Sequence, residues 1–172
     1  MNREHEMTVS EIMVKMIVYS QGNPHDINHF LKVYAYAKTI AECEGVAPFQ
    51  QKTVEIAAIL HDIACPLCRE KYGNTNGKRQ EAEGAPLAEA FLADSGLPED
   101  LRKRVVFLVG HHHTIDSIDG LDYQILLEAD YLVNADEAGY PLENIQNTEA
   151  RLFKTPTGIA LLRSIYMSKL MS

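Results

Sequence analysis

The sequence predicts an all-α protein that forms a single domain. Apolar residues recur at helical spacing along most of the chain, and no segment alternates convincingly between apolar and polar residues as a half-buried strand does. The 172 residues show no internal repeat, low-complexity tract or linker, and this length suits one domain with a substantial core. We therefore expect a bundle of about seven helices over residues 1–172.

The first helix has recognisable ends. Thr8 and Glu11 have the spacing of a capping box, in which each residue bonds to the backbone of the other. Residues 22–24, Gly-Asn-Pro, are typical of a turn that stops a helix. The first helix should therefore begin after Thr8 and end before this turn.

The second helix should begin at Asp26 or Asn28, either of which suits a cap, and should end at Gly45. His29 lies on its buried side, one turn into the helix, whereas His25 precedes the helix. A histidine that only packs in the core or caps the helix is the alternative for His29. The apolar positions on the same side are Val33, Tyr36, Ala37 and Ile40.

A third helix is expected from about Gln50 to Ala64, and its apolar run at residues 56–60 leads directly into His61 and Asp62. His61 continues the apolar stripe, and Asp62 lies close to it. A buried carboxylate must be paired or bound to a cation, because an isolated buried charge is too costly. The alternative is that Asp62 caps a neighbouring helix.

Residues 69–83 are expected to form a polar loop directly after this pair. Cys65 and Cys68 precede it as an isolated CxxC, which we interpret as ordinary thiols, with a redox switch as the alternative, since structural zinc needs four ligands. The loop is either simply solvated or a lid that brings cations to an anionic substrate. Its cations are Arg69, Lys71, Lys78 and Arg79.

Helical patterns continue through the second half of the chain. Pro86 suits the first turn of a helix that ends at Gly96, and Pro98 begins the next, which ends in the three histidines at 111–113. A final helix is expected at residues 155–170, packed on the rest of the domain.

Another helix should begin at Leu121, and it carries Asp130 in the middle of its apolar stripe. An acid in that position is expected to have a partner. Glu128 and Asp136 fall on other faces and are expected at the surface, and Pro141 begins a short polar segment.

Two imidazoles and two carboxylates thus lie on the inner faces of three predicted helices, at His29, His61, Asp62 and Asp130. A mixed nitrogen and oxygen set suits one divalent transition metal, namely Mn²⁺, Fe²⁺, Co²⁺, Ni²⁺ or Zn²⁺. Such an ion lowers the pKa of a bound water and polarises a phosphoryl oxygen. The constellation therefore predicts hydrolysis of a phosphate ester by a metal-activated water.

The order of these residues resembles that of the HD-domain superfamily of metal-dependent phosphohydrolases. The matching segments lie between residues 25 and 137, at 29–33, 57–63, 109–112 and 128–130. The resemblance implies an all-α fold, a divalent metal at the four positions above, and cleavage of phosphomonoesters, nucleotides or cyclic dinucleotides. The HD-GYP signature of cyclic-di-GMP enzymes is absent, which weighs against that substrate.

The chain departs from dinuclear members of this superfamily, which place a further histidine before the last aspartate. No histidine lies between Asp62 and His111, and where relatives have one this chain reads Gln-Glu-Ala-Glu-Gly-Ala at residues 80–85. This favours one metal; a second held by His111, His112 and either Glu81 or Glu83 is the alternative.

With one metal, His111 or His112 is expected to contact the phosphate or act as an acid. We therefore expect Asp62, His111 and His112 to be catalytic, with His113 facing outward. The substrate-binding cations are expected to be Arg69, Lys78 and Arg79.

The net charge of −8 argues against duplex nucleic acid or an anionic membrane as the main partner, since both need a basic face. No apolar core of a signal peptide follows residues 1–6, and the apolar run 105–109 is too short to span a bilayer, so we expect a cytoplasmic protein. The expected substrate is a small phosphate ester, preferably a nucleotide. An HD-fold di-iron oxygenase and a non-catalytic metal- or ligand-binding helical module are the alternatives, and a homodimer is left open.

Overall fold

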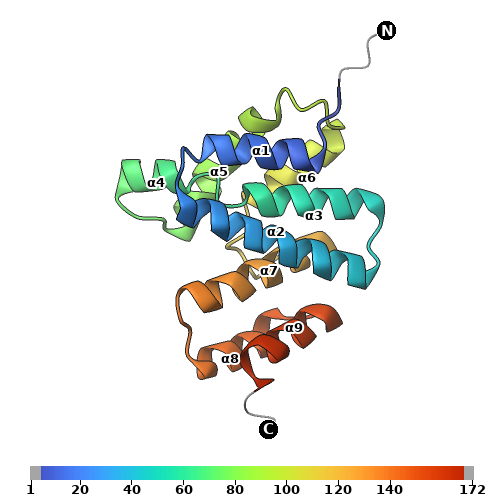
Figure 1. Cartoon of the computed structure of the whole chain (residues 1–172), viewed down its shortest axis with the longest axis vertical. Coiled ribbons are helices and arrows are strands. Elements are labelled where there is room, and N and C mark those ends of the chain that lie inside the picture. Colours follow the sequence, from blue (N-terminus) through green and yellow to red (C-terminus); the bar gives the residue numbers. More distant parts are fainter. Residues whose placement is uncertain (1–4, 169–172) are drawn as a thin grey trace.

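The chain folds into α-helices, as its apolar spacing predicts. The computed structural model describes residues 5–168, and over this range it contains nine α-helices and no β-strand (Figure 1). Within the same range, no helix combines the length and the apolar character needed to cross a membrane. The helices are α1 (Val9–Tyr19), α2 (Pro24–Glu44), α3 (Pro48–Leu60), α4 (Cys65–Tyr72), α5 (Gly77–Leu92), α6 (Glu99–Val109), α7 (Leu121–Glu137), α8 (Leu142–Leu152) and α9 (Pro156–Tyr166).

The first two helices begin at side-chain caps. In α1 the predicted capping box is present: the Thr8 backbone N–H donates to Glu11 Oε2 at 2.7 Å, and the Glu11 N–H donates to Thr8 Oγ1 at 3.2 Å. In α2 the cap is Asn23, not Asp26 or Asn28 as predicted. Asn23 is favoured because the following Pro24 has no backbone N–H to satisfy in the first turn.

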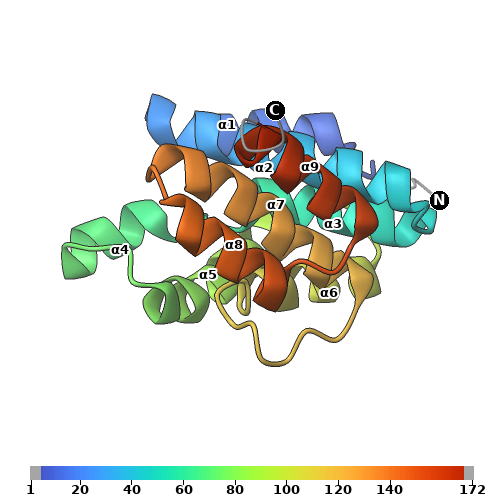
Figure 2. The same ribbon diagram turned by 90° about the horizontal axis from the view of Figure 1, so that it is seen from below.

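Helices α2, α3 and α7 form the centre of the molecule. Helix α2 packs along both α3 and α7, and α3 also packs against α1, α6 and α7 (Figures 1 and 2). Residues 53–60 of α3 are all buried, and so are 12 of the 17 residues of α7. Because these helices are enclosed on nearly all sides, polar residues in α7 and at the end of α3 lie inside the protein.

The segment expected to be a loop at residues 69–83 is mostly helical. Helix α4 ends at Gly73, whose φ of +69° is easily adopted without a side chain, and α5 begins after Asn76. Asn76 accepts a hydrogen bond from the Lys78 backbone N–H at 3.1 Å. Pro86 therefore lies inside α5 and not in its first turn as predicted. Figures 1 and 2 both show α4 projecting from the side of the bundle.

The C-terminal part of the described chain adds a helical pair below α7 (Figure 1). The polar segment after Pro141 forms α8, and α9 packs against α2, α7 and α8. Helix α9 ends at Tyr166, whereas the sequence predicted a helix to residue 170, which lies outside the described residues.

Glu128 is completely buried, so its predicted place at the surface was wrong. Its Oε1 accepts backbone hydrogen bonds from Lys154 at 2.6 Å and Thr155 at 3.0 Å, and its Oε2 accepts one from the Thr155 hydroxyl. A Cβ at Gly158 would lie 2.0 Å from Glu128 Oε2, so only glycine fits there. The carboxylate thus ties α7 to the start of α9.

Candidate metal centre

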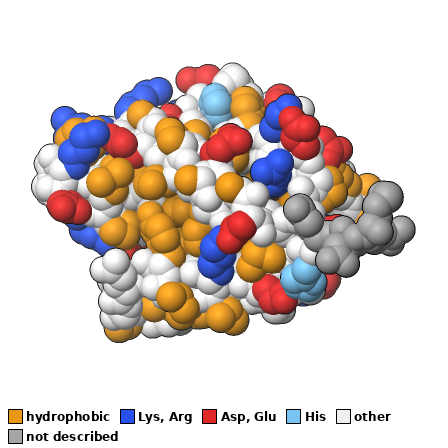
Figure 3. Space-filling model, turned by 90° about the horizontal axis from the view of Figure 1, so that it is seen from above, with side chains coloured by type: hydrophobic (Ala, Val, Ile, Leu, Met, Phe, Trp, Pro, Cys, Tyr) orange, Lys and Arg blue, Asp and Glu red, His pale blue; other side chains and the backbone are white. Residues whose placement is uncertain are grey.

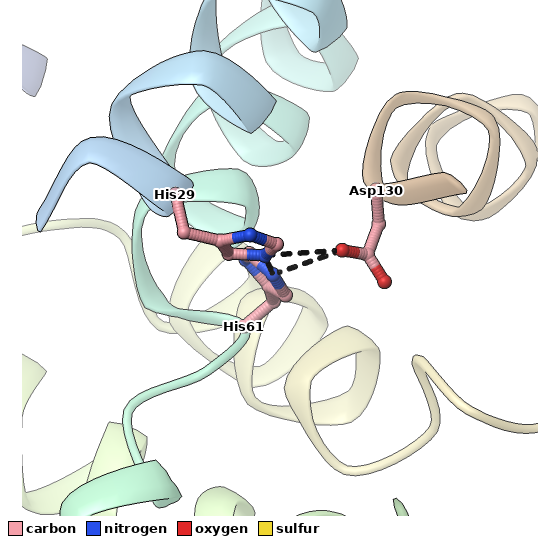
Figure 4. A group of neighbouring side chains, drawn as sticks. All are labelled: His29, His61 and Asp130. Carbon is pink, nitrogen blue, oxygen red and sulfur yellow. Dashed lines mark hydrogen bonds and ion pairs between the residues drawn. The ribbon is translucent and has the colours of Figure 1, made fainter. Parts of the chain in front are cut away.

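Three buried side chains from α2, the end of α3 and α7 meet in the core. Figure 4 shows His29, His61 and Asp130 pointing toward one another. The two Nε2 atoms are 3.2 Å apart, and Asp130 Oδ1 lies 3.3 Å from that of His29 and 3.4 Å from that of His61. Such a group can hold a metal ion.

Asp62 lies beside this group. Its Oδ2 is 3.3 Å from His29 Nε2 and 3.6 Å from His61 Nε2. Its Oδ1 points the other way, to His112 Nε2 at 3.5 Å. The structure therefore brings together the four residues for which the sequence predicts metal binding, and it adds His112 on the far side of Asp62.

The three buried histidines share one orientation. Each Nδ1 lies within hydrogen-bond distance of an oxygen acceptor, which favours a proton on Nδ1 and directs Nε2 toward the centre. Histidines that bind metals are usually held in this way. The acceptors are Ala58 O for His61 at 2.7 Å, Glu137 Oε2 for His29 at 2.8 Å and Val109 O for His112 at 2.8 Å.

The Nε2 atoms at the centre have too few hydrogen-bond donors around them. Two Nε2 lone pairs that face each other at 3.2 Å, as in His29 and His61, repel unless a proton or a cation lies between them. The Nε2 of His112 is buried and has no hydrogen-bond partner among residues 5–168. Buried polar atoms without partners are costly and rare. A divalent cation would satisfy these atoms, so the residues present fit a metal.

The same groups shift one another's protonation. Burial disfavours the charged form of His61, but the carboxylates of Asp62 and Asp130 outweigh burial and raise the pKa of His61 to about 9. Burial would raise the pKa of both acids, yet the neighbouring imidazoles hold each carboxyl pKa below its usual range. The metal-free centre therefore retains a proton at neutral pH, and a metal must displace it.

A second group of possible ligands adjoins the first. Ligand atoms of Asp62, His112 and His113 lie within 4.8 Å of one another. The Nε2 of His113 is 3.1 Å from Gln80 Oε1. This leaves Nδ1 of His113 free to accept a hydrogen bond or to bind a metal ion. His113 is exposed, as predicted, but it lines the pocket above Asp62. Gln80 thus contacts a histidine that lies beside Asp62.

The ligand set suggested for a second metal is not assembled. Glu81 accepts hydrogen bonds from the His113 backbone and from the Thr114 hydroxyl, and Glu83 binds Lys71 and Tyr72. Among residues 5–168, neither carboxylate belongs to a group of possible metal ligands. His111 also lies apart: its Nδ1 is 2.7 Å from Phe107 O, and its ring stacks on Phe107 at 4.1 Å.

A small pocket of about 180 Å³ leads to the metal centre. Arg69 lies at its mouth in a bidentate ion pair with Asp26, while Lys78 is not among the lining residues. Arg79 packs over the Tyr72 ring, with its guanidinium carbon 4.3 Å from the ring centroid. Of the three predicted substrate-binding cations, the structure thus brings only Arg69 to this pocket.

Cys65 also lines the pocket, and burial raises the pKa of its thiol far above the usual range. It is therefore a neutral, unreactive thiol, in keeping with the interpretation of the CxxC as ordinary thiols. The described cysteines form no disulfide.

Two residues of the site were missed from the sequence. Asn134 donates to Asp130 Oδ1 at 2.9 Å, and Glu137 contacts both His29 and, at 2.7 Å, Lys32. Asn134 and Glu137 follow Asp130 by four and seven residues in α7, so they share its face. That helical spacing was the signal that could have identified them.

The comparison with known families now identifies the class of this protein. The HD domain family model matches residues 26–154, well over half of the chain, so the chain belongs to the HD domain family.

A crystal structure from an uncultured Thermotogales bacterium, described as a predicted HD superfamily hydrolase, has a similar fold. Its TM-score is 0.68 at 24% sequence identity, over 94% of this chain and 86% of that chain. At this identity the likeness establishes a shared fold. No curated protein matches the chain.

Proposed function

We propose that this protein is a metal-dependent phosphohydrolase that cleaves a small phosphate ester, preferably a nucleotide. The observation that carries the proposal is the set of inward-facing Nε2 and carboxylate atoms of His29, His61, Asp62 and Asp130 below a pocket with Arg69 at its mouth. A divalent metal bound there supplies Lewis acidity, which activates water and polarises a phosphoryl oxygen. The reaction breaks the ester P–O bond and yields inorganic phosphate and an alcohol.

The chain's own groups have distinct roles in this proposal. The Arg69 guanidinium matches phosphate oxygens in two-point contact and would exchange Asp26 for substrate. Asp62 lies between the histidine pair and His112, so it links the two sides of the site. Of the residues predicted to be catalytic, Asp62 and His112 are the two that meet here. Duplex nucleic acid and membranes are not proposed as partners, and the expected compartment is the cytoplasm, where nucleotides are available.

The test is a phosphate-release screen over nucleotides and sugar phosphates with the wild type, Asp62→Ala and the control Asp136→Ala. Asp136 is an exposed acid of α7, so its loss should leave activity unchanged. Asp62→Ala should lower release by at least about a hundredfold, since even partners that only orient ligands contribute 10- to 100-fold. Equal release by the wild type and Asp62→Ala would overturn the proposal.

The second ligand group favours one further candidate, a two-metal centre. His29, His61 and Asp130 would hold one metal, His112 and His113 would hold the other, and Asp62 lies beside both groups. Two metals would serve either phosphoester hydrolysis or, with iron, the oxygenase chemistry of some HD-fold proteins. Metal stoichiometry and an iron spectrum distinguish these. A non-catalytic module would instead show a large stabilisation by metal and no turnover in the screen.

A further inference from the structure

A groove adjoins the metal pocket on the outer side of the Asp26–Arg69 ion pair. It has a volume of about 430 Å³ and lies between the end of α1, the start of α2, and α4. Asp26 and Arg69 line both hollows, so the groove and the pocket meet at this ion pair. Figure 1 shows α4 beside the turn that joins α1 to α2. Seen from above, hydrophobic side chains gather on the face that carries α1 (Figure 3).

The groove combines apolar and polar walls, as small-molecule sites do. Its polar lining residues are Ser20, Gln21, Asn23, Asp26, Arg69 and Glu70. The Tyr19 ring is held edge-on by Phe91, at 5.8 Å between centroids and 84° between planes. The Ser20 hydroxyl, which also lines the groove, donates to Met16 O at 2.9 Å. Within the described part of the chain, the Tyr19 hydroxyl and the side-chain amide of Gln21 form no hydrogen bond to another residue, so both are free to bind a ligand. The apolar walls come from Val18, Tyr19, Leu67 and Leu87.

The metal pocket itself is too small for a whole nucleotide. Its 180 Å³ falls below the roughly 300–1,000 Å³ of typical small-molecule sites, and apart from Cys65 its lining residues are of polar or charged types. It suits a phosphoryl group, and the rest of the ester must extend beyond it. A second adjoining hollow shares only Thr75 with the pocket and has no apolar side chain, since it is lined by Asn74, Thr75, Asn76 and Arg79.

We propose that the groove is the subsite for the leaving group of the ester and that this group is an uncharged ring system of nucleoside size. The inference rests on the proposed phosphohydrolase function, and it deepens it by selecting nucleoside monophosphates over compact phosphate esters. The phosphate lies against Arg69 at the junction, and the ring packs between the Tyr19 side and Leu67. Apolar contact and the free polar groups at the rim together provide the preference.

Filling the groove from its exposed rim tests this inference without disturbing the core. Val18 is 72% exposed and lines the groove, so Val18→Trp places an indole in it. Val14 lies one turn earlier in α1, is 61% exposed and does not line the groove, so Val14→Trp is a matched control. Thermal unfolding of both variants checks that each one folds.

The measurement is equilibrium binding by calorimetry of the common nucleoside 5′-monophosphates and of glycerol 3-phosphate. The wild type and Val14→Trp should bind at least one nucleotide about tenfold more tightly than glycerol 3-phosphate, the lower end of discrimination by an apolar pocket. Val18→Trp should lose that preference while its affinity for glycerol 3-phosphate is unchanged.

If the wild type binds nucleotides no more tightly than glycerol 3-phosphate, the proposed subsite is contradicted. Equal losses in Val14→Trp and Val18→Trp would overturn it too. Because the readout is binding, it is independent of turnover: a nucleotide preference without phosphate release from any ester would support the subsite and contradict the proposed function.

Discussion

The Nδ1 atom of His29 lies 2.8 Å from Oε2 of Glu137, whose other oxygen pairs with Lys32. The carboxylate fixes the imidazole so that Nε2 faces the metal centre, and it makes that nitrogen a stronger ligand. Glu137 is therefore a positioning residue that acts through His29.

Replacing this carboxylate should weaken metal binding. Glu137→Ala is expected to lower metal affinity by about 10- to 100-fold, and Glu137→Gln, which keeps an oxygen acceptor without the charge, by less. Metal titration of the apo-protein measures both, with the exposed neighbour Asp136→Ala as the control. Affinity equal to that of the wild type in Glu137→Ala would show that His29 needs no such partner.

The stability of the metal-free protein should fall as pH rises from about 6.5 to 9. The pKa of His61 is raised to about 9 in the folded state, above its ordinary value of 6.5. A raised pKa contributes stability that is complete below the unfolded value and is lost as pH passes through the folded value. We expect Tm to fall by roughly 5–10 °C over this window.

Metal should remove this pH dependence, because it replaces the proton that His61 loses. Thermal unfolding in chelator and with added Mn²⁺ or Zn²⁺, at several pH values, measures the effect. A metal-free Tm that rises over the same window would contradict the proposed charge balance.

The adjacent residues His111 and His112 should differ in their contribution to catalysis. His112 contacts Asp62 with an Nε2 that has no other partner, whereas His111 stacks on Phe107. We expect His112→Ala to lower kcat by about a hundredfold or more and His111→Ala by less than about threefold. Steady-state phosphate release measures kcat of both variants. A larger loss in His111→Ala than in His112→Ala would contradict this prediction and assign the catalytic role to His111.

Arg69 and Lys78 should also differ, in their contribution to substrate binding. Arg69→Gln is expected to raise KM for a phosphate ester by about tenfold, since it removes a charged two-point contact. Lys78→Gln, which changes a residue outside the pocket lining, should leave KM unchanged. Asp26→Asn should lower KM, because it weakens the ion pair that competes with substrate. Equal effects of Arg69→Gln and Lys78→Gln would point to general attraction by positive charge.

A stability test concerns the junction of α7 and α9. Gly158→Ala would bring a methyl group into the buried Glu128 carboxylate, and we expect a loss of about 2–4 kcal/mol in unfolding free energy. Helix propensity alone predicts a gain of about 1 kcal/mol from the same change. The exposed Ala160→Gly variant in α9 calibrates that propensity. Urea unfolding measures the unfolding free energy of both variants. A loss in Gly158→Ala would show the clash with Glu128, and a gain would show that the site tolerates a methyl group.

Much of the fold follows from local sequence signals. Thr8 and Glu11 mark the start of α1, and Gly45 marks the end of α2, because caps depend on nearby residues. Helix α4 was missed because its eight residues span only about two turns, too few for a helical period to show. The start of α5 was missed because Pro86 was taken as its first turn, although Asn76 provides the cap.

The metal ligands could be identified because buried acids and histidines on apolar faces need partners. The surroundings could not be identified in the same way. Glu128 looked exposed because α7 is enclosed on nearly all sides, which removes the contrast between its faces. Among the histidines at 111–113, the orientation of each depends on a turn whose geometry the sequence does not specify. Distances between helices, and hence the second ligand group, depend on packing.

The most direct test of the central claim is phosphate release measured while metal is titrated into protein verified to be metal-free. We expect no release from the stripped protein, and activity that rises in proportion to bound divalent metal until the sites are filled. Stripped protein that releases phosphate as fast as the loaded protein would contradict the account.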